Sequence, residues 1–251
     1  MIKFFRKIRY NLLEKGKTSK YFKYAIGEIF LVVIGILIAL QINNWNQKRL
    51  QKLTLSNYYE RMHEELESSR NELDNLIFGI DSLVILNTKT LEILNSNNKD
   101  SLPTLQKTLG ALGTAWGNNF NYPIVQEFMN EGYLTKVNNS KIKDELQAFS
   151  FQLNWFKTLD KGIGDQYSLT IEPFINKHLN YSQIALDRYK NTLVSGGPET
   201  DFEWLFNNLE AWNIITLKLE LLVTQKEGLK EFKSMRERLT NLLSSELNLK
   251  L

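Results

Sequence analysis

The chain has 251 residues, which suits one membrane anchor and one folded domain. Its charge is uneven, because residues 1–49 carry a net charge of +8 and residues 50–251 a net charge of −5. The acidic balance of the larger part argues against nucleic-acid binding. The absence of cysteine excludes disulfides and thiolate metal sites.

Residues 1–23 form a basic tail, with eight Lys and Arg residues against one acid, Glu14. Basic residues beside a membrane span remain on the cytoplasmic side, so this tail is expected inside the cell. Its apolar residues recur at the spacing of an interfacial amphipathic helix: Ile2, Phe5, Ile8, Leu12 and Leu13. A disordered tail that only sets the topology is the alternative.

Residues 24–42 read YAIGEIFLVVIGILIALQI and contain one formal charge, Glu28. A helix rises about 1.5 Å per residue, so this run is long enough to cross about 30 Å of hydrocarbon. It predicts a transmembrane helix that serves as an uncleaved signal anchor. A cleaved signal peptide is the main alternative, but the apolar run is longer than that of most signal peptides and Ile38-Ala39-Leu40-Gln41 is a poor cleavage site.

The flanking charges predict the topology of the chain. Only Lys48, Arg49 and Lys52 lie close to the far end of the span. We therefore expect a single-pass protein of the cell inner membrane, with a cytoplasmic N-terminus and with residues 43–251 in the periplasm.

Three residues of the span could pair it with another transmembrane helix. Glu28 lies about one turn inside the cytoplasmic edge, where a carboxylate usually has a partner. Gly35 and Ala39 form a small-xxx-small pair that lets helices approach closely. These residues suggest a homo-oligomer or an envelope protein partner. The alternative is that Glu28 sits among the lipid headgroups.

The first part of the soluble domain is expected to be one long amphipathic helix. From Gln47 to Leu94 apolar residues recur every three or four positions. The pattern also allows two helices joined near Phe78-Gly79. The polar stretch 96–100 is expected to end this helix.

A short helix is predicted over residues 102–112. Asp100 or Ser101 can cap it, and Pro103 suits its first turn. Glycines then flank or interrupt an irregular stretch over 114–122.

Further helices are expected in the second half of the chain. Thr200 and Glu203 match a capping box at the start of the last helix, which could be interrupted near Asn207-Asn208. The expected stretches are a short helix from Pro123 to Gly132, a longer one from Ser140 to a kink or restart at Pro173, a piece over 174–193, and a last helix over 201–248 after the break at 195–198.

The predicted fold class is therefore all-α. One N-terminal transmembrane helix is followed by an extracytoplasmic bundle, with coiled-coil-like packing, of three to four long helices plus short helices. Strand signals are weak, because the sequence has neither Asn-Gly nor Asp-Gly turns.

Two blocks of sequence resemble a known family. Residues 16–46, GKTSKYFKYAIGEIFLVVIGILIALQINNWN, resemble the N-terminal signature of a family of uncharacterised single-pass envelope membrane proteins that is abundant in Bacteroidota. Glu131-Gly132-Tyr133-Leu134 with Val137-Asn138-Asn139 and Ile142 is similar to its second, looser block, although Glu131 replaces the commoner serine. The resemblance implies an anchored helical domain and supplies no activity, substrate or cofactor.

The sequence does not predict catalytic, cofactor-binding or metal-binding residues, and we expect a protein that is not an enzyme and needs no cofactor. Glu60 and His63 have the Glu-x-x-His spacing of di-iron bundles, but such sites require a second copy, and His178 has Ile175 in place of the glutamate. A solvated helix face is the simpler interpretation of Glu60 and His63.

The irregular stretch contains the best candidate for a recognition loop. It concentrates aromatic rings and amides, which commonly bind partners: Trp116, Asn118, Asn119, Phe120 and Tyr122. The alternative is a loop whose rings cover the end of the helical core. Other aromatic residues at helical spacing are expected in the core: Trp155, Phe156, Trp204, Phe206 and Trp212.

Ser82 and Ser101 are candidates for O-glycosylation. Asp81-Ser82-Leu83 and Asp100-Ser101-Leu102 match the Asp-Ser/Thr-apolar pattern of envelope glycoproteins in Bacteroidota, which is an inference from the family resemblance. Ser101 could equally be a helix cap, and Ser82 could be buried.

Two function classes remain open from the sequence. The first is a structural or interaction module of the cell envelope, anchored in the lipid bilayer. The second is an extracytoplasmic ligand-binding or sensory module, which would signal through a partner.

Overall fold

The computed structural model describes residues 10, 18–118 and 120–248. Helix accounts for 84% of the structure, and the described residues contain no strand, which confirms the all-α prediction. The chain divides into two compact units, Met1–Asn57 and Tyr58–Leu251.

The first unit contains most of helix α2 (Thr18–Ser68). Within the described residues one helix is long and apolar enough to cross a membrane, with a mean hydropathy of 2.5 in its most apolar window and none of that window buried. Such a helix could be a membrane anchor or a signal sequence. The predicted interfacial helix falls in a region of which only Tyr10 is described.

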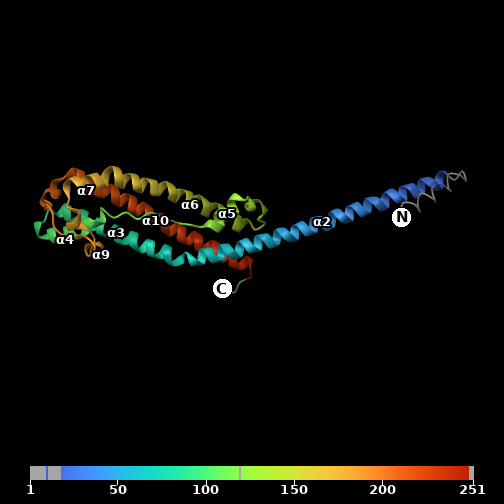
Figure 1. The fold of residues 1–251 in the computed structure, drawn as a ribbon, viewed down its shortest axis with the longest axis horizontal. Helices are drawn as coiled ribbons and strands as arrows, with labels where there is room; N and C mark the ends of the chain where they lie inside the picture. The colour runs from blue at the N-terminus through green and yellow to red at the C-terminus, as the bar shows by residue number, and fades with distance from the viewer. Residues whose placement is uncertain (1–9, 11–17, 119, 249–251) are drawn as a thin grey trace. The chain divides into compact units, whose positions relative to one another are not determined.

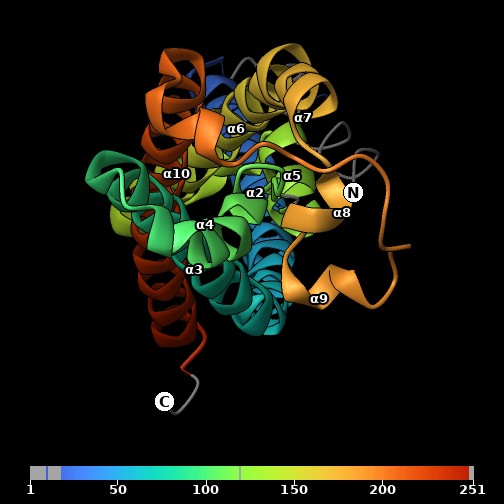
Figure 2. The same cartoon turned by 90° about the vertical axis from the view of Figure 1, so that its left-hand side faces the viewer.

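Three long helices dominate the second unit: α3 (Arg70–Ser96), α6 (Ser140–Gln166) and α10 (Leu209–Glu246). Helix α10 packs along both α3 and α6 (Figure 1). Figure 2 shows short helices gathered at one end of the long ones. The shorter elements are η1 (Lys99–Ser101), α4 (Leu102–Thr108), η2 (Leu109–Ala111), α5 (Pro123–Asn130), η3 (Tyr133–Lys136), the π-helix η4 (Tyr167–Ile171), α7 (Glu172–His178), α8 (Tyr181–Ile184), α9 (Asp187–Lys190) and η5 (Glu203–Asn207).

The long helix predicted after the span is interrupted at Ser69, and the alternative of a joint near Phe78-Gly79 is wrong. Gly79 lies inside α3, where an added Cβ would overlap the ring of Trp116. Gly79 therefore allows the ring of Trp116 to lie close to the backbone of α3, and it does not interrupt the helix.

Two predicted caps are also wrong. The side chain of Asn98, rather than that of Asp100 or Ser101, accepts the N–H of Asp100 at the helix start. Thr200 accepts the N–H of Asn180 over 2.7 Å and so does not form the capping box with Glu203. The Thr200 side chain serves a contact twenty residues away, which sequence spacing does not indicate.

The predicted helical piece over 174–193 is three short helices, because the chain is extended at Leu179 and again near Ala185 and Leu186. Three other boundaries agree with prediction: Pro103 lies in the first turn of α4, Pro123 begins α5, and Ser140 begins α6. The predicted start of the last helix at 201 is wrong, because residues 203–207 form η5 and α10 begins at Leu209, after the possible interruption at Asn207-Asn208.

An apolar cluster fills the interior near the short helices. It joins α3, α4, α7, α8 and the start of α10. The members from α10 are Ala211, Ile214 and Ile215. The prediction that Trp204 and Trp212 are core residues is wrong, since they are 38% and 36% exposed, whereas Phe156 is 1% exposed, as expected of a core residue.

Candidate functional site

The predicted recognition loop belongs to a segment that crosses the second unit lengthwise. We call residues 113–118 and 120–122 the crossing segment. It runs without regular structure from η2 to α5 along the long helices (Figure 1). Its residues make contacts with α3, α6 and α10.

Trp116 joins the crossing segment to α3 and α9. Its ring lies over Gly79, where the missing side chain leaves room for it. On the ring lies the guanidinium of Arg188, 4.5 Å from the ring centroid, and the same guanidinium is 4.7 Å from the ring centroid of Tyr189. Cation–π contacts of this kind hold short elements such as α9 in place.

Asn118 fixes the centre of the crossing segment through a buried set of hydrogen bonds. Its backbone N–H and its side-chain amide both donate to Asp160 Oδ1 on α6, each over 2.8 Å. Gln225 on α10 donates through Nε2 to Asn118 Oδ1 over 3.0 Å and to the carbonyl of Trp116 over 2.9 Å. These bonds satisfy groups that would be costly to bury without partners.

Phe120 and Tyr122 insert into an aromatic core. Phe120 lies 5.0 Å from Phe156 and 4.9 Å from Phe232 between ring centroids. Tyr122 is 1% exposed and packs edge-to-face against Phe149 at 5.0 Å. Edge-to-face pairs of this kind are favourable.

The structure thus brings four of the five predicted recognition residues together, but in the interior. Asn118 and Tyr122 are buried, and Trp116 and Phe120 are partly buried. This placement agrees with the alternative interpretation, in which the rings complete the core. Asn119 lies outside the described residues.

Replacing Asn118 by alanine is expected to lower the free energy of unfolding by about 2 kcal/mol, because Asp160 loses one donor and Gln225 loses one acceptor in a buried place. Denaturation of the full chain in detergent, followed by circular dichroism, measures this change. Asn154→Ala, an exposed change on α6, is the matched control and should not destabilise the chain. Equal effects of the two changes would contradict the role assigned to Asn118.

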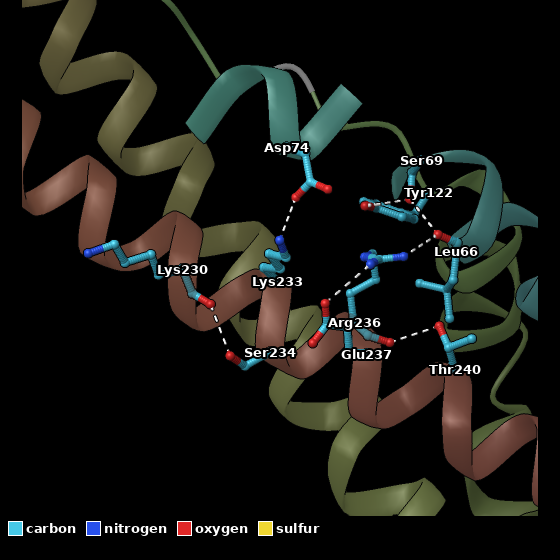
Figure 3. Close-up of polar contacts among 10 residues, drawn as sticks. All are labelled: Leu66, Ser69, Asp74, Tyr122, Lys230, Lys233, Ser234, Arg236, Glu237 and Thr240. Atoms are coloured by element: carbon cyan, nitrogen blue, oxygen red, sulfur yellow. Dashed lines mark hydrogen bonds and ion pairs between the residues drawn. The ribbon is translucent and has the colours of Figure 1, made fainter. Parts of the chain in front are cut away.

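The crossing segment ends beside the break between α2 and α3, where a second polar group is buried (Figure 3). The hydroxyl of Tyr122 donates to Ser69 Oγ over 3.0 Å, and Ser69 Oγ donates to the carbonyl of Leu66 over 2.9 Å. Arg236 on α10, only 2% exposed, donates through Nη1 to the same carbonyl over 2.9 Å. Carbonyls at a helix end need such donors.

The charges around Arg236 only partly compensate its guanidinium. Nη2 lies 3.8 Å from Glu237, whose side chain is half exposed, and Nε has no hydrogen-bond partner among the described residues. Nearby, Lys233 donates to Asp74 over 2.7 Å and holds the pKa of that carboxyl below its usual value. Burial raises the pKa of Tyr122. Arg236 and Ser69 therefore form a structural clamp on the helix break.

The remaining predicted site residues do not gather at one place. An added Cβ at Gly35 would meet no neighbour within 4 Å, and Ala39 is exposed, so helix pairing through them stays a prediction. Glu28 is half exposed and has an interaction within the chain. Ser82 Oγ donates to the carbonyl of Phe78 over 2.9 Å. Ser82 and Ser101 are both half-buried, and their glycosylation stays a prediction.

Within residues 10, 18–118 and 120–248 no group of three or more His, Asp or Glu side chains is arranged to hold a metal ion. His178 stacks on Trp204 with 4.6 Å between ring centroids.

Sequence reasoning missed two buried cations, Arg236 and Lys218, which are 2% and 1% exposed. A signal was present, because both fall on the apolar stripe of α10, where residues recur every three or four positions: Ile215, Lys218, Leu222, Gln225, Leu229, Phe232, Arg236 and Leu239. A charge on such a stripe indicates a buried ionisable group.

The fold defines an all-helical protein with one long apolar N-terminal helix. No family model matches the chain, and neither a curated protein nor a solved structure matches it.

Proposed function

We propose that this protein is a single-pass membrane protein whose helical domain acts as a structural or interaction module in the cell envelope. One observation carries the proposal. Residues 24–42 are apolar and lie in a helix whose most apolar window has no buried residue. A fully exposed apolar helix is costly in water and favourable in lipid.

The topology forms part of the proposal. The basic tail favours a cytoplasmic N-terminus, which would place the domain on the periplasmic side of the inner membrane. The resemblance to single-pass envelope proteins of Bacteroidota supports the same assignment. Partners would be the lipid bilayer together with a second copy or another envelope protein, contacted through Glu28, Gly35 and Ala39 or through the helical domain.

Protease treatment of spheroplasts tests this assignment. We expect added protease to digest residues 43–251 and to leave the N-terminal tail protected, and the full chain to sediment with membranes until detergent is added. A cytoplasmic protein serves as the control for spheroplast integrity. Protection of the domain, or full-length chain that stays soluble without detergent, would refute the proposal. Affinity purification from native membranes would then identify the partner.

A ligand-binding or sensory module is the second candidate function. The observation that favours it is the buried cation Lys218, for which the described residues provide no partner.

A further inference from the structure

Helices α6 and α10 leave a groove open between their outer sides, which we call the α6/α10 groove. It is a hollow of about 920 Å³, and much of its wall is apolar. Phe151, one of the lining side chains, is 73% exposed, although phenylalanine is usually buried. A groove walled by exposed apolar side chains is typical of an interaction surface. The apolar lining residues are Ala148, Phe151, Trp155, Val223 and Met235.

Two contacts show how α6 and α10 are aligned along the groove. Trp155 on α6 lies against Gly228, where an added Cβ would overlap the ring of the tryptophan. Ten residues earlier on α6, Glu145 pairs over 2.9 Å with Arg238, which is ten residues later on α10. The two helices therefore run in opposite directions and keep one register between these contacts. By this register Phe151 is level with the part of α10 that lies one turn after Gly228.

One turn further along the same two helices lies a second hollow, which has charged walls. Asp144 and Arg238 both line it and lie at the same level. Asp144 is exposed and has neither a hydrogen bond nor an ion pair among the described residues. Arg238 pairs with Glu145, but its side chain remains 53% exposed, so its guanidinium can bind a second carboxylate. This end of the groove thus offers one free acid and one accessible base.

We propose that a second copy of this chain occupies the α6/α10 groove, so that the protein forms a symmetric homodimer. Symmetric dimers use the same surface patch on both copies. A two-fold axis parallel to the helices places α6 of each copy opposite α10 of the other copy at the same level. The inference rests on the proposed interaction role, and it names the partner and the contact surface.

The shape and the charges of the groove suit this arrangement. Phe151 of each copy lies opposite the hollow of the other copy, beside Gly228 and Ser234, whose small size leaves room for its ring. Asp144 lies opposite Arg238 of the second copy, and opposite charges that face each other favour one register over others. The dimer therefore removes two exposed phenylalanine rings from water and gives the free carboxylate a partner.

The size of the groove also suits a dimer. Residues 223–242 of α10 line the two hollows, and about 20 residues of helix span about 30 Å. Two packed helices present a face about 20 Å wide, because their axes lie about 10 Å apart. Such a face amounts to about 600 Å² per copy, and a total of about 1,200 Å² is the lower end of the range for specific interfaces.

Light scattering during size-exclusion chromatography of the full chain in detergent tests the dimer. We expect the unaltered chain to have the mass of a dimer. Phe151→Asp should raise the dissociation constant at least about thirtyfold, because a charge replaces the central apolar contact of each copy. Phe78→Asp on α3 is the matched control, since Phe78 is 76% exposed, and it should leave the dimer intact. A monomeric unaltered chain, or equal effects of the two changes, would overturn the proposal.

Disulfide crosslinking tests which helices meet, because the chain has no cysteine of its own. One chain carries Asp144→Cys, and a co-expressed chain with a different tag carries Arg238→Cys. We expect oxidation to join these two chains. Glu220→Cys, an exposed change on α10 at another level, replaces Arg238→Cys in the control and should give no crosslink. Equal crosslinking in both combinations would contradict the arrangement.

Gly35→Leu separates this dimer from pairing through the apolar N-terminal helix. The dimer should survive the change, because the α6/α10 groove does not involve that helix. Loss of the dimer in Gly35→Leu together with its retention in Phe151→Asp would reject the groove as the contact surface. The spheroplast result does not depend on these outcomes, so failure of the dimer and failure of the proposed anchoring are distinguishable.

Discussion

Replacing Lys218 by methionine is expected to raise the free energy of unfolding by about 3 kcal/mol at pH 7. Burial lowers the pKa of Lys218 from 10.5 to about 8. Each unit of difference between the pKa of a group in the folded state and its pKa in the unfolded state corresponds to about 1.4 kcal/mol of stability. Methionine keeps the apolar stem and removes the charge, so the penalty of burying that charge disappears.

The pH dependence gives this prediction a second measurement. The folded state binds the proton of Lys218 less tightly than the unfolded state does, so the native protein loses stability when the group is charged. The advantage of Lys218→Met is therefore complete below pH 8 and declines to zero as the pH rises through 10.5. Urea denaturation from pH 6.5 to pH 10.5 measures it.

Lys230→Met is the matched control for Lys218→Met. Lys230 is exposed and pairs with Glu227 over 3.0 Å, so its loss should change stability by no more than about 0.5 kcal/mol at any pH. If Lys218→Met destabilised the chain at pH 7, the ammonium would have a partner that offsets its burial.

Replacing Gly110 by alanine is expected to lower the free energy of unfolding by about 3 kcal/mol. An added Cβ would overlap the carbonyl oxygen of Ile184 and would lie 2.9 Å from the backbone nitrogen of Leu186. Both neighbours are backbone atoms, which cannot rotate away as a side chain can. The end of α8 would have to move, and the apolar cluster that contains Ile184 would open.

Replacing Gly162 by alanine should change the free energy of unfolding in the opposite direction. Gly162 is exposed inside α6, and an added Cβ would meet no neighbour within 4 Å. Alanine there should stabilise the chain by about 0.5–1 kcal/mol through helix propensity. Denaturation of both variants under one set of conditions measures the contrast. A loss of stability at both positions would show that the close approach at Gly110 is not the cause.

The spacing of apolar residues was sufficient to predict the helices. Apolar residues at every third or fourth position predicted the helical regions that contain α3, α6 and α10, and Pro123 and Ser140 predicted the starts of α5 and α6. These signals are local, because helix formation depends on backbone hydrogen bonds four residues apart and on side chains one turn away. The apolar run at 24–42 is equally local, since its length and lack of charge are sufficient to mark a helix that can span a membrane.

Only the tertiary structure could decide whether the crossing segment and the polar residues are buried, and which partners they have. Trp116 to Tyr122 looked like a recognition loop, yet Asn118 meets Asp160 forty-two residues away and Gln225 more than one hundred residues away. The break at Ser69 likewise depends on Arg236, from the far end of the chain. Whether a polar side chain is buried, and which group forms its hydrogen bond, depends on residues that are distant in sequence. The sequence alone does not show that these residues lie close together. For the same reason the sequence revealed Lys218 as a charge, and only the packing of α10 revealed it as an unpaired one.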